Sequence, residues 1–202
     1  MRFSDIKIGH IYNVIFDPVR DCEFDGRHLA LVLKKNNDGK TFIVMPLTSA
    51  ANGAGVNKLH VGSLACLPTS LRTNNTYAVY NQIRTVNANR FIALKEGNNV
   101  VECMMDKDIF YNLLMLGMQE MVYSIPQDDR ITIWKKMYEN EKVIKAKDIA
   151  YNIKAGSGIL SDVEKNNKLL QIKELIQGIV YTLDQKFVDD GINIIFDEAK
   201  NL

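Results

Sequence analysis

The sequence predicts an α+β protein in which a small, strand-rich barrel or sandwich is followed by helices. Two observations predict this class. Before about residue 105, short apolar runs rich in Val, Ile, Tyr and Phe lie between residues that favour turns, a spacing typical of many short strands. From Asp106 onward, apolar residues recur every three or four positions, as they do along one face of a helix. We therefore expect a β-rich domain that ends in a helix over residues 1–122 and a helical extension over 123–202.

The strands of the first part are delimited by residues that favour turns. Asp17 and Pro18 end the first strand, and Asn-Asn-Asp-Gly-Lys at 36–40 predicts a hairpin because Asn, Asp and Gly tolerate positive φ. A second turn is expected at 97–99. The predicted strands cover 10–16, 28–35, 41–47, 58–62, 77–83 and 90–95.

The second part carries the signals of three helices. The first begins at Asp106 and has its apolar face at Ile109, Phe110, Leu113, Leu114, Leu116 and Met121. Pro126 interrupts it, and a helix over about 127–152 is predicted to bury Ile133, Trp134, Met137, Ile144 and Tyr151. Ser161 and Glu164 then have the spacing of a capping box. The helix after them is either a coiled-coil strand or a plain amphipathic helix, with apolar positions at Leu169, Ile172, Ile176, Ile179 and Leu183.

Composition is that of a soluble globular protein, with 47% hydrophobic and 24% charged residues. The formal net charge is +1, so a surface for nucleic acid would need local clustering of basic residues. No apolar run approaches the ~20 residues of a membrane span, and the N-terminus lacks the apolar core of a signal peptide. We expect a cytoplasmic protein without contact to a membrane.

Cysteines and histidines are few and widely spaced. The three cysteines are Cys22, Cys66 and Cys103, and the three histidines are His10, His28 and His60. No Cys-x-x-Cys pair and no His spacing typical of metal ligands occurs. We therefore expect reduced thiols, no metal centre and no cofactor.

Three segments place groups suited to RNA chemistry at strand ends. RNA can be cut without a metal because the ribose 2′-hydroxyl is an internal nucleophile, which needs help with its proton and a cation for the phosphate. Hairpin geometry places Arg27 at the start of one strand next to Thr48 at the end of its partner, where Ser49 follows. The segment 80–91 adds Arg84, Thr85 and Arg90. Alternatively, these residues are a salt-bridged arginine, a strand terminator and a polar edge strand.

The order of four segments resembles the MazF/PemK toxin family over about residues 5–120. The segments are GHIYNVIF (9–16), RHLALVL (27–33), VMPLTSA (44–50) and YNQIRTVNANRF (80–91). The resemblance implies an SH3-like barrel of the CcdB/MazF type with a C-terminal helix, acting as a homodimer. Members of the family cleave single-stranded RNA, mostly mRNA, at selected sequences and so arrest growth. A cognate antitoxin neutralises them with a flexible segment laid over the active groove.

The resemblance also implies roles for residues. Arg27 matches the catalytic arginine, which stabilises charge and donates a proton, and Thr48 matches the threonine that orients the 2′-hydroxyl. Cleavage would leave a 2′,3′-cyclic phosphate and a 5′-hydroxyl. The residues expected to contact the substrate are His28, Ser49, Gln82, Arg84 and Thr85.

Departures from the family leave some points open. His28 replaces a common proline and is either a base near neutral pH or a structural residue of its strand. His10 and Asn81 stand where many members have Asp, and the first loop matches only through 21–23, so no cleavage motif can be transferred.

Two other functions are compatible with these residues. One is a non-catalytic SH3-like module that binds nucleic acid or protein, and the other is a toxin that acts on gyrase. The extension lies outside the resemblance, and it would strengthen a dimer, engage the antitoxin or recruit a target.

Overall fold

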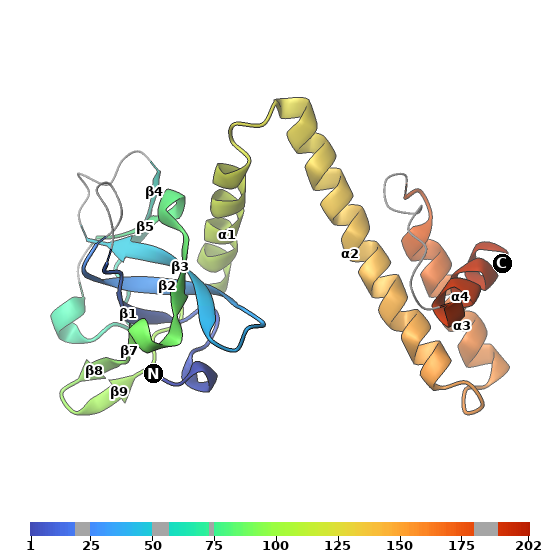
Figure 1. Cartoon of the computed structure of the whole chain (residues 1–202), viewed down its shortest axis with the longest axis horizontal. Coiled ribbons are helices and arrows are strands. Elements are labelled where there is room, and N and C mark those ends of the chain that lie inside the picture. The colour runs from blue at the N-terminus through green and yellow to red at the C-terminus, as the bar shows by residue number, and fades with distance from the viewer. Residues whose placement is uncertain (19–24, 50–56, 73–74, 180–189) are drawn as a thin grey trace. The chain divides into compact units, whose positions relative to one another are not determined.

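The computed structural model describes residues 1–18, 25–49, 57–72, 75–179 and 190–202. The chain divides into two compact units, Met1–Ser124 and Ile125–Leu202 (Figure 1). Among the described residues, no helix is both long enough and apolar enough to cross a membrane.

The first unit is built on a seven-stranded antiparallel sheet. Its order is β4-β5-β3-β2-β1-β7, and β6 also pairs with β3. A separate hairpin pairs β8 with β9. The strands are β1 (Ile11–Ile15), β2 (Arg27–Lys35), β3 (Thr41–Thr48), β4 (Lys58–Gly62), β5 (Thr76–Val79), β6 (Arg84–Asn87), β7 (Phe91–Ile92), β8 (Leu94–Glu96) and β9 (Asn99–Val101).

The β2–β3 hairpin contains a β-bulge. Near the turn, Lys34 lies opposite Ile43, but the next pair joins Val32 to Val44, so Leu33 is an extra residue on β2. Beyond the bulge the register is regular and ends with Leu29 opposite Leu47. The bulge therefore sets which residues of the two strands meet at the far end of the hairpin.

Successive residues of β1, β2 and β3 alternate between two apolar clusters, because side chains of a strand point to opposite faces. One cluster lies among the strands and includes Val14, Phe16, Ala30, Val32, Phe42, Val44, Val86 and Phe91. The other cluster lies between the sheet and α1 (Lys107–Met121), and it includes Ile11, Leu31, Met45, Leu47, Ala78 and Leu113. The helix begins at Asp106, whose carboxylate accepts hydrogen bonds from the backbone N–H groups of Asp108 and Ile109.

The α+β class and the MazF-type barrel predicted from the sequence are confirmed. Two predicted strands differ from the structure. The strand predicted over 90–95 is divided into β7 and β8, which belong to different sheets. The strand predicted over 77–83 is wrong in its length. β5 ends at Val79, Tyr80–Gln82 forms a 3-10 turn, and the chain then enters the separate strand β6. The turn redirects the chain, so β5 pairs with the end of β3 while β6 pairs with its beginning.

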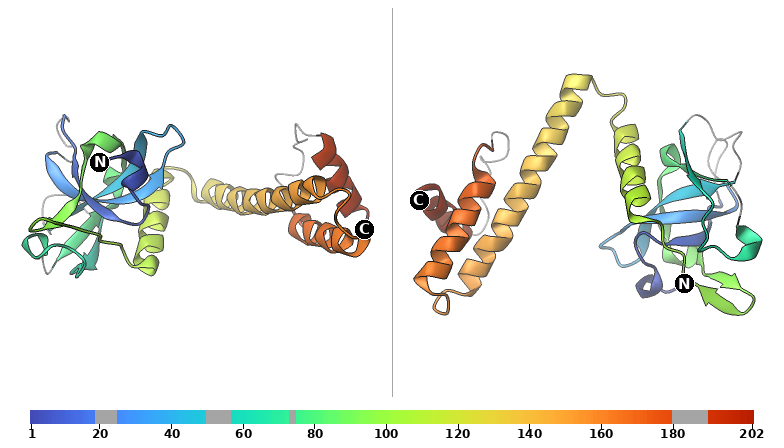
Figure 2. Two further views of the ribbon diagram at one scale, coloured as in Figure 1. Left: turned by 90° about the horizontal axis from the view of Figure 1, so that it is seen from below. Right: turned by 180° about the vertical axis from the view of Figure 1, so that it is seen from behind.

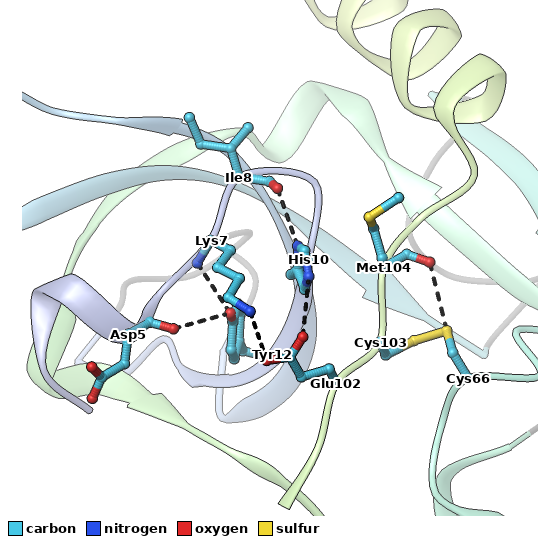
Figure 3. A network of polar contacts seen from close by, with 9 residues as sticks. All are labelled: Asp5, Lys7, Ile8, His10, Tyr12, Cys66, Glu102, Cys103 and Met104. Carbon is cyan, nitrogen blue, oxygen red and sulfur yellow. Dashed lines mark hydrogen bonds and ion pairs between the residues drawn. A yellow bond between two sulfur atoms is a disulfide. The ribbon is translucent and has the colours of Figure 1, made fainter.

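The expectation that all cysteines are reduced is wrong for two of them. Cys66 and Cys103 form a disulfide with a Cα–Cα distance of 4.8 Å (Figure 3). The two residues are 37 positions apart, and they meet because the turn after β4 packs against the segment between β9 and α1. On that segment the backbone of Met104 forms an isolated antiparallel β-bridge with His10. Glu102 forms an ion pair of 2.7 Å with Lys7 (Figure 3). Cys22 lies outside the described residues.

The second unit consists, in its described part, of α2 (Gln127–Ala155), α3 (Asp162–Ile176) and α4 (Asp190–Lys200). The helices surround one apolar core, and Figure 2 shows α3 beside the C-terminal half of α2. The predicted capping box is confirmed, because the Ser161 hydroxyl and the Glu164 carboxylate each accept a backbone N–H of the other residue.

The buried face of α2 differs from the predicted one. The core contains Val143, Ala146, Ala150 and Ile153. Met137, Ile144 and Tyr151 are instead exposed, with 43%, 46% and 43% of their surface accessible. The small alanines allow α3 and α4 to pack closely against α2. Met137, Ile144 and Tyr151 form a second apolar face of the helix, which lies outside the core of its unit.

The third helix is shorter than predicted. α3 ends at Ile176, and Gly178 follows with φ of +77°, a conformation that favours glycine and stops the helix. Ile179 still packs in the core, although it lies beyond the helix. The predicted position Leu183 lies outside the described residues.

Candidate active site

The candidate site lies where β2 begins and β3 ends. The paired residues farthest from the hairpin turn are Leu29 and Leu47, so the residues just before Leu29 and just after Leu47 share one end of the sheet. Continued by two steps, this register would place Thr48 level with His28 and Ser49 level with Arg27. The hairpin alone therefore brings together a cation, an imidazole and two hydroxyl groups.

A pocket of about 260 Å³ opens at this end of the sheet. Its walls come from β1, β2, β3 and β5 and from the 3-10 turn Thr69–Leu71. The lining residues are Asn13, Arg27, His28, Leu29, Leu47, Thr48, Ser49, Ser70, Leu71 and Thr76. The predicted catalytic residues Arg27 and Thr48 are thus placed on one pocket, together with the predicted substrate contacts His28 and Ser49.

Arg27 differs from the other arginines described in the first unit. Its guanidinium forms no hydrogen bond or ion pair with any described residue. The other four are each held by polar groups. Arg2 pairs with Asp5, Arg72 and Arg90 donate to backbone carbonyls, and Arg84 donates to Gln82. Arg27 therefore has its donors available for an anion in the pocket.

His28 is half-buried at the start of β2. Burial lowers the pKa of its imidazole below the usual 6.5, while a hydrogen bond to the Asp25 backbone and the charges of Asp25 and Asp17 oppose that shift. The lowered pKa favours the neutral form of the imidazole at pH 7. A neutral ring can accept or donate a hydrogen bond at the edge of the pocket.

Two lining residues that sequence reasoning missed are buried and polar. Asn13 on β1 and Thr76 on β5 are only 5% and 3% exposed. Buried polar side chains normally have hydrogen-bond partners, yet neither side chain has one among the described residues. An amide inside the apolar strand Ile-Tyr-Asn-Val-Ile was the available signal for Asn13. No sequence signal marked Thr76 or Ser70.

The wall that carries Ser70 and Leu71 is braced from several sides. Arg72 donates hydrogen bonds of 2.8 and 2.9 Å to the carbonyls of Ala65 and Leu67. The Thr69 N–H donates to the Glu96 carboxylate at 2.7 Å. The Cys66–Cys103 disulfide fixes the same segment to the start of α1. This wall is thus connected to elements far from it in the sequence.

Three predicted substrate contacts lie outside the pocket lining. Gln82 ends the 3-10 turn, and Arg84 and Thr85 follow on β6 opposite Val44 and Ile43. The Arg84 guanidinium lies 5.2 Å from the centre of the Phe16 ring. These residues flank the first half of β3, whereas the pocket lies at its end.

No group of three His, Cys, Asp or Glu side chains close enough to hold a metal ion occurs in the part of the chain that the structure describes. The polar groups that line the pocket include the guanidinium of Arg27, the imidazole of His28 and the hydroxyls of Thr48, Ser49 and Ser70.

Comparison with known proteins gives one family match. Residues 7–107, half of the chain, match the family described as PemK-like, MazF-like toxin of type II toxin-antitoxin system. A crystal structure of MazF (form I) from Deinococcus radiodurans is similar at 20% identity and a TM-score of 0.41, over 55% of this chain and 92% of that one. No curated protein matches the chain.

Proposed function

Because the chain belongs to the PemK-like, MazF-like toxins of type II toxin–antitoxin systems, a family of endoribonuclease toxins, we propose that it cleaves single-stranded RNA at the pocket of Arg27 and Thr48. Cleavage proceeds without a metal ion and at selected sequences, most often in mRNA. The observation that carries this proposal is that Arg27, whose guanidinium has no partner among the described residues, and Thr48 line the same pocket.

The reaction uses the nucleophile that RNA itself contains. The 2′-oxygen attacks the adjacent phosphorus, the bond from phosphorus to the 5′-oxygen breaks, and a 2′,3′-cyclic phosphate forms. Thr48 orients the 2′-hydroxyl through its own hydroxyl group, and the 2′-hydroxyl loses its proton to water. Arg27 holds the phosphoryl oxygens with two parallel N–H donors and donates a proton to the departing 5′-oxygen. Water then returns a proton to Arg27.

The remaining predicted contacts extend the site along the RNA. Ser49 donates to a phosphate or ribose oxygen next to the scissile bond, and His28 contacts the substrate as a neutral ring. Gln82, Arg84 and Thr85 bind the strand where it leaves the pocket along β6. A cognate antitoxin is the protein partner of the family, and we propose that it covers this groove. The active assembly is a homodimer.

The first test measures RNA cleavage in the presence of EDTA. The wild type is expected to release fragments with 5′-hydroxyl ends and 2′,3′-cyclic phosphates. Arg27→Ala and Thr48→Val are expected to lower the rate by roughly a hundred-fold or more, the usual effect of removing one group that stabilises the transition state. Arg2→Ala is the matched control, because Arg2 is exposed and pairs with Asp5 on another part of the unit.

Two outcomes would contradict the proposal. RNA that binds without being cut would indicate a binding module. Cleavage that stops in EDTA and resumes with added magnesium would indicate a metal-dependent reaction.

A further inference from the structure

We propose that the pocket holds one nucleobase of the RNA next to the scissile bond and that Asn13 reads the edge of this base. The inference rests on the proposed function, which supplies the RNA. It adds a specificity-determining residue and a second polar contact, Thr76, at the opposite end of the pocket.

A row of paired residues crosses the sheet at the pocket, and its apolar members Leu29 and Leu47 line the pocket beside Asn13. Asn13 pairs with Leu29, Leu29 with Leu47, and Leu47 with Ala78, so the row runs over β1, β2, β3 and β5. Thr76 lies two residues before Ala78 and therefore on the same face. A flat aromatic base can lie on Leu29 and Leu47, with the Asn13 amide at one end and the Thr76 hydroxyl at the other.

The polar groups of Asn13 and Thr76 face open space in the pocket. Only Arg130 Nε, in the other unit, is a side-chain nitrogen or oxygen that is sealed from solvent without a partner among the described residues. The Asn13 amide and the Thr76 hydroxyl have no partner either, so they must remain accessible. The pocket is the opening that both residues line. Buried polar groups of this kind favour a ligand that completes their hydrogen bonds.

The size and chemistry of the pocket fit a base. A cavity of about 150 Å³ is enough to hold a benzene ring, so 260 Å³ accommodates one heterocycle. The amide offers a donor and an acceptor side by side, which is the pattern that base edges present. Arg27 lines the same pocket, so the base that is read belongs to a nucleotide adjoining the bound phosphate.

The test compares cleavage sites by sequencing the ends of fragments from a random RNA pool. Asn13→Asp replaces a donor and acceptor with acceptors alone, so preference at one position is expected to shift towards bases with an amino or imino donor. The expected change in the base ratio is roughly five- to a hundred-fold, the range for one paired contact to a base edge. Thr76→Val is expected to relax preference at the same position. Asn99→Asp, the same chemical change on the exposed strand β9, keeps the wild-type pattern.

The outcomes separate this inference from the proposed function. If the wild type cleaves and Arg27→Ala does not, but Asn13→Asp and Thr76→Val keep every base frequency, base reading by Asn13 is overturned and the nuclease stands. If the wild type does not cleave RNA, both are overturned.

A second measurement covers the case in which Asn13→Asp does not fold. The side-chain amide signal of Asn13 is followed by NMR in the wild type during titration with an oligonucleotide that carries a 2′-deoxyribose at the scissile position. A shift that saturates with binding supports the inference, and an unchanged signal at saturation overturns it.

Discussion

At the scale of the residue, protonation of His28 at the pocket makes the stability of the folded protein depend on pH. Its imidazole is more buried in the folded protein than in the unfolded chain, and this burial lowers its pKa. Between the lowered folded value and the unfolded value of about 6.5, the unfolded state binds more protons. The contribution of His28 to stability is therefore complete above pH 6.5 and is lost as the pH falls through the folded pKa.

We expect the His28 ring signal to titrate below 6.5 in an NMR experiment. Denaturant unfolding at about pH 7.5 and pH 5.5 should then show a smaller loss of stability in His28→Gln than in the wild type. His10 and His60 are common to both proteins, so the comparison isolates His28. A His28 titration above 6.5, or an equal loss in both proteins, would contradict the assignment.

The pocket shows how far single residues could be predicted. Arg27, His28, Thr48 and Ser49 were predictable because one hairpin with a recognisable turn brings them together. Thr76 was not predictable, because it reaches the pocket through the pairing of β5 with β3, which no local pattern encodes. The roles of all these residues, and those of Gln82, Arg84 and Thr85, remain predictions.

At the scale of the element, the starts of helices were the most predictable features. Asp106 and the capping box of Ser161 and Glu164 act within one helical turn, so the sequence contains the whole interaction. The faces were less predictable. In α2 the large side chains suggested one buried face, but close packing with α3 and α4 selects the face with Ala146 and Ala150.

The disulfide joins elements that local sequence patterns could not connect. It closes a loop of 37 residues between the turn after β4 and the segment before α1. In the chain-entropy view, such a link destabilises the unfolded state, and its loss costs about 2–4 kcal/mol. We expect reduction, or Cys66→Ser, to lower the free energy of unfolding of the first unit by that amount in denaturant titrations.

Cys22→Ser is the control for the disulfide, because Cys22 takes no part in the bridge. Equal stability of the oxidised and reduced wild type would show that the link contributes nothing to the fold.

At the scale of the whole molecule, the chain contains two separate sets of core residues. Among the described residues, the clusters of the first unit contain none from the second, and the cluster of the second unit is formed by α2, α3, α4 and Ile179. Each unit therefore has its own source of stability. The predicted boundary between residues 122 and 123, and the role of the extension, stay predictions.

Calorimetry of the full chain should show this division. Ile172 is fully buried in the core of the second unit, so Ile172→Ala is expected to cost about 2–5 kcal/mol there. The transition of the second unit should move to lower temperature while that of the first stays in place. Leu170→Ala, two residues away and 47% exposed, should leave both nearly unchanged. A joint shift of both transitions would mean that the units unfold together.

The bulge at Leu33 has a consequence for insertions and deletions. Deleting Leu33 would leave Val32 opposite Val44 in an unbroken ladder and Arg27 at its place on the pocket. Deleting any residue between Arg27 and Val32 would turn the guanidinium to the other face of the sheet, because neighbouring positions of a strand face opposite ways. Length variation in this strand is therefore compatible with the proposed role of Arg27 when it occurs at the bulge, and incompatible with that role when it occurs between the bulge and the pocket.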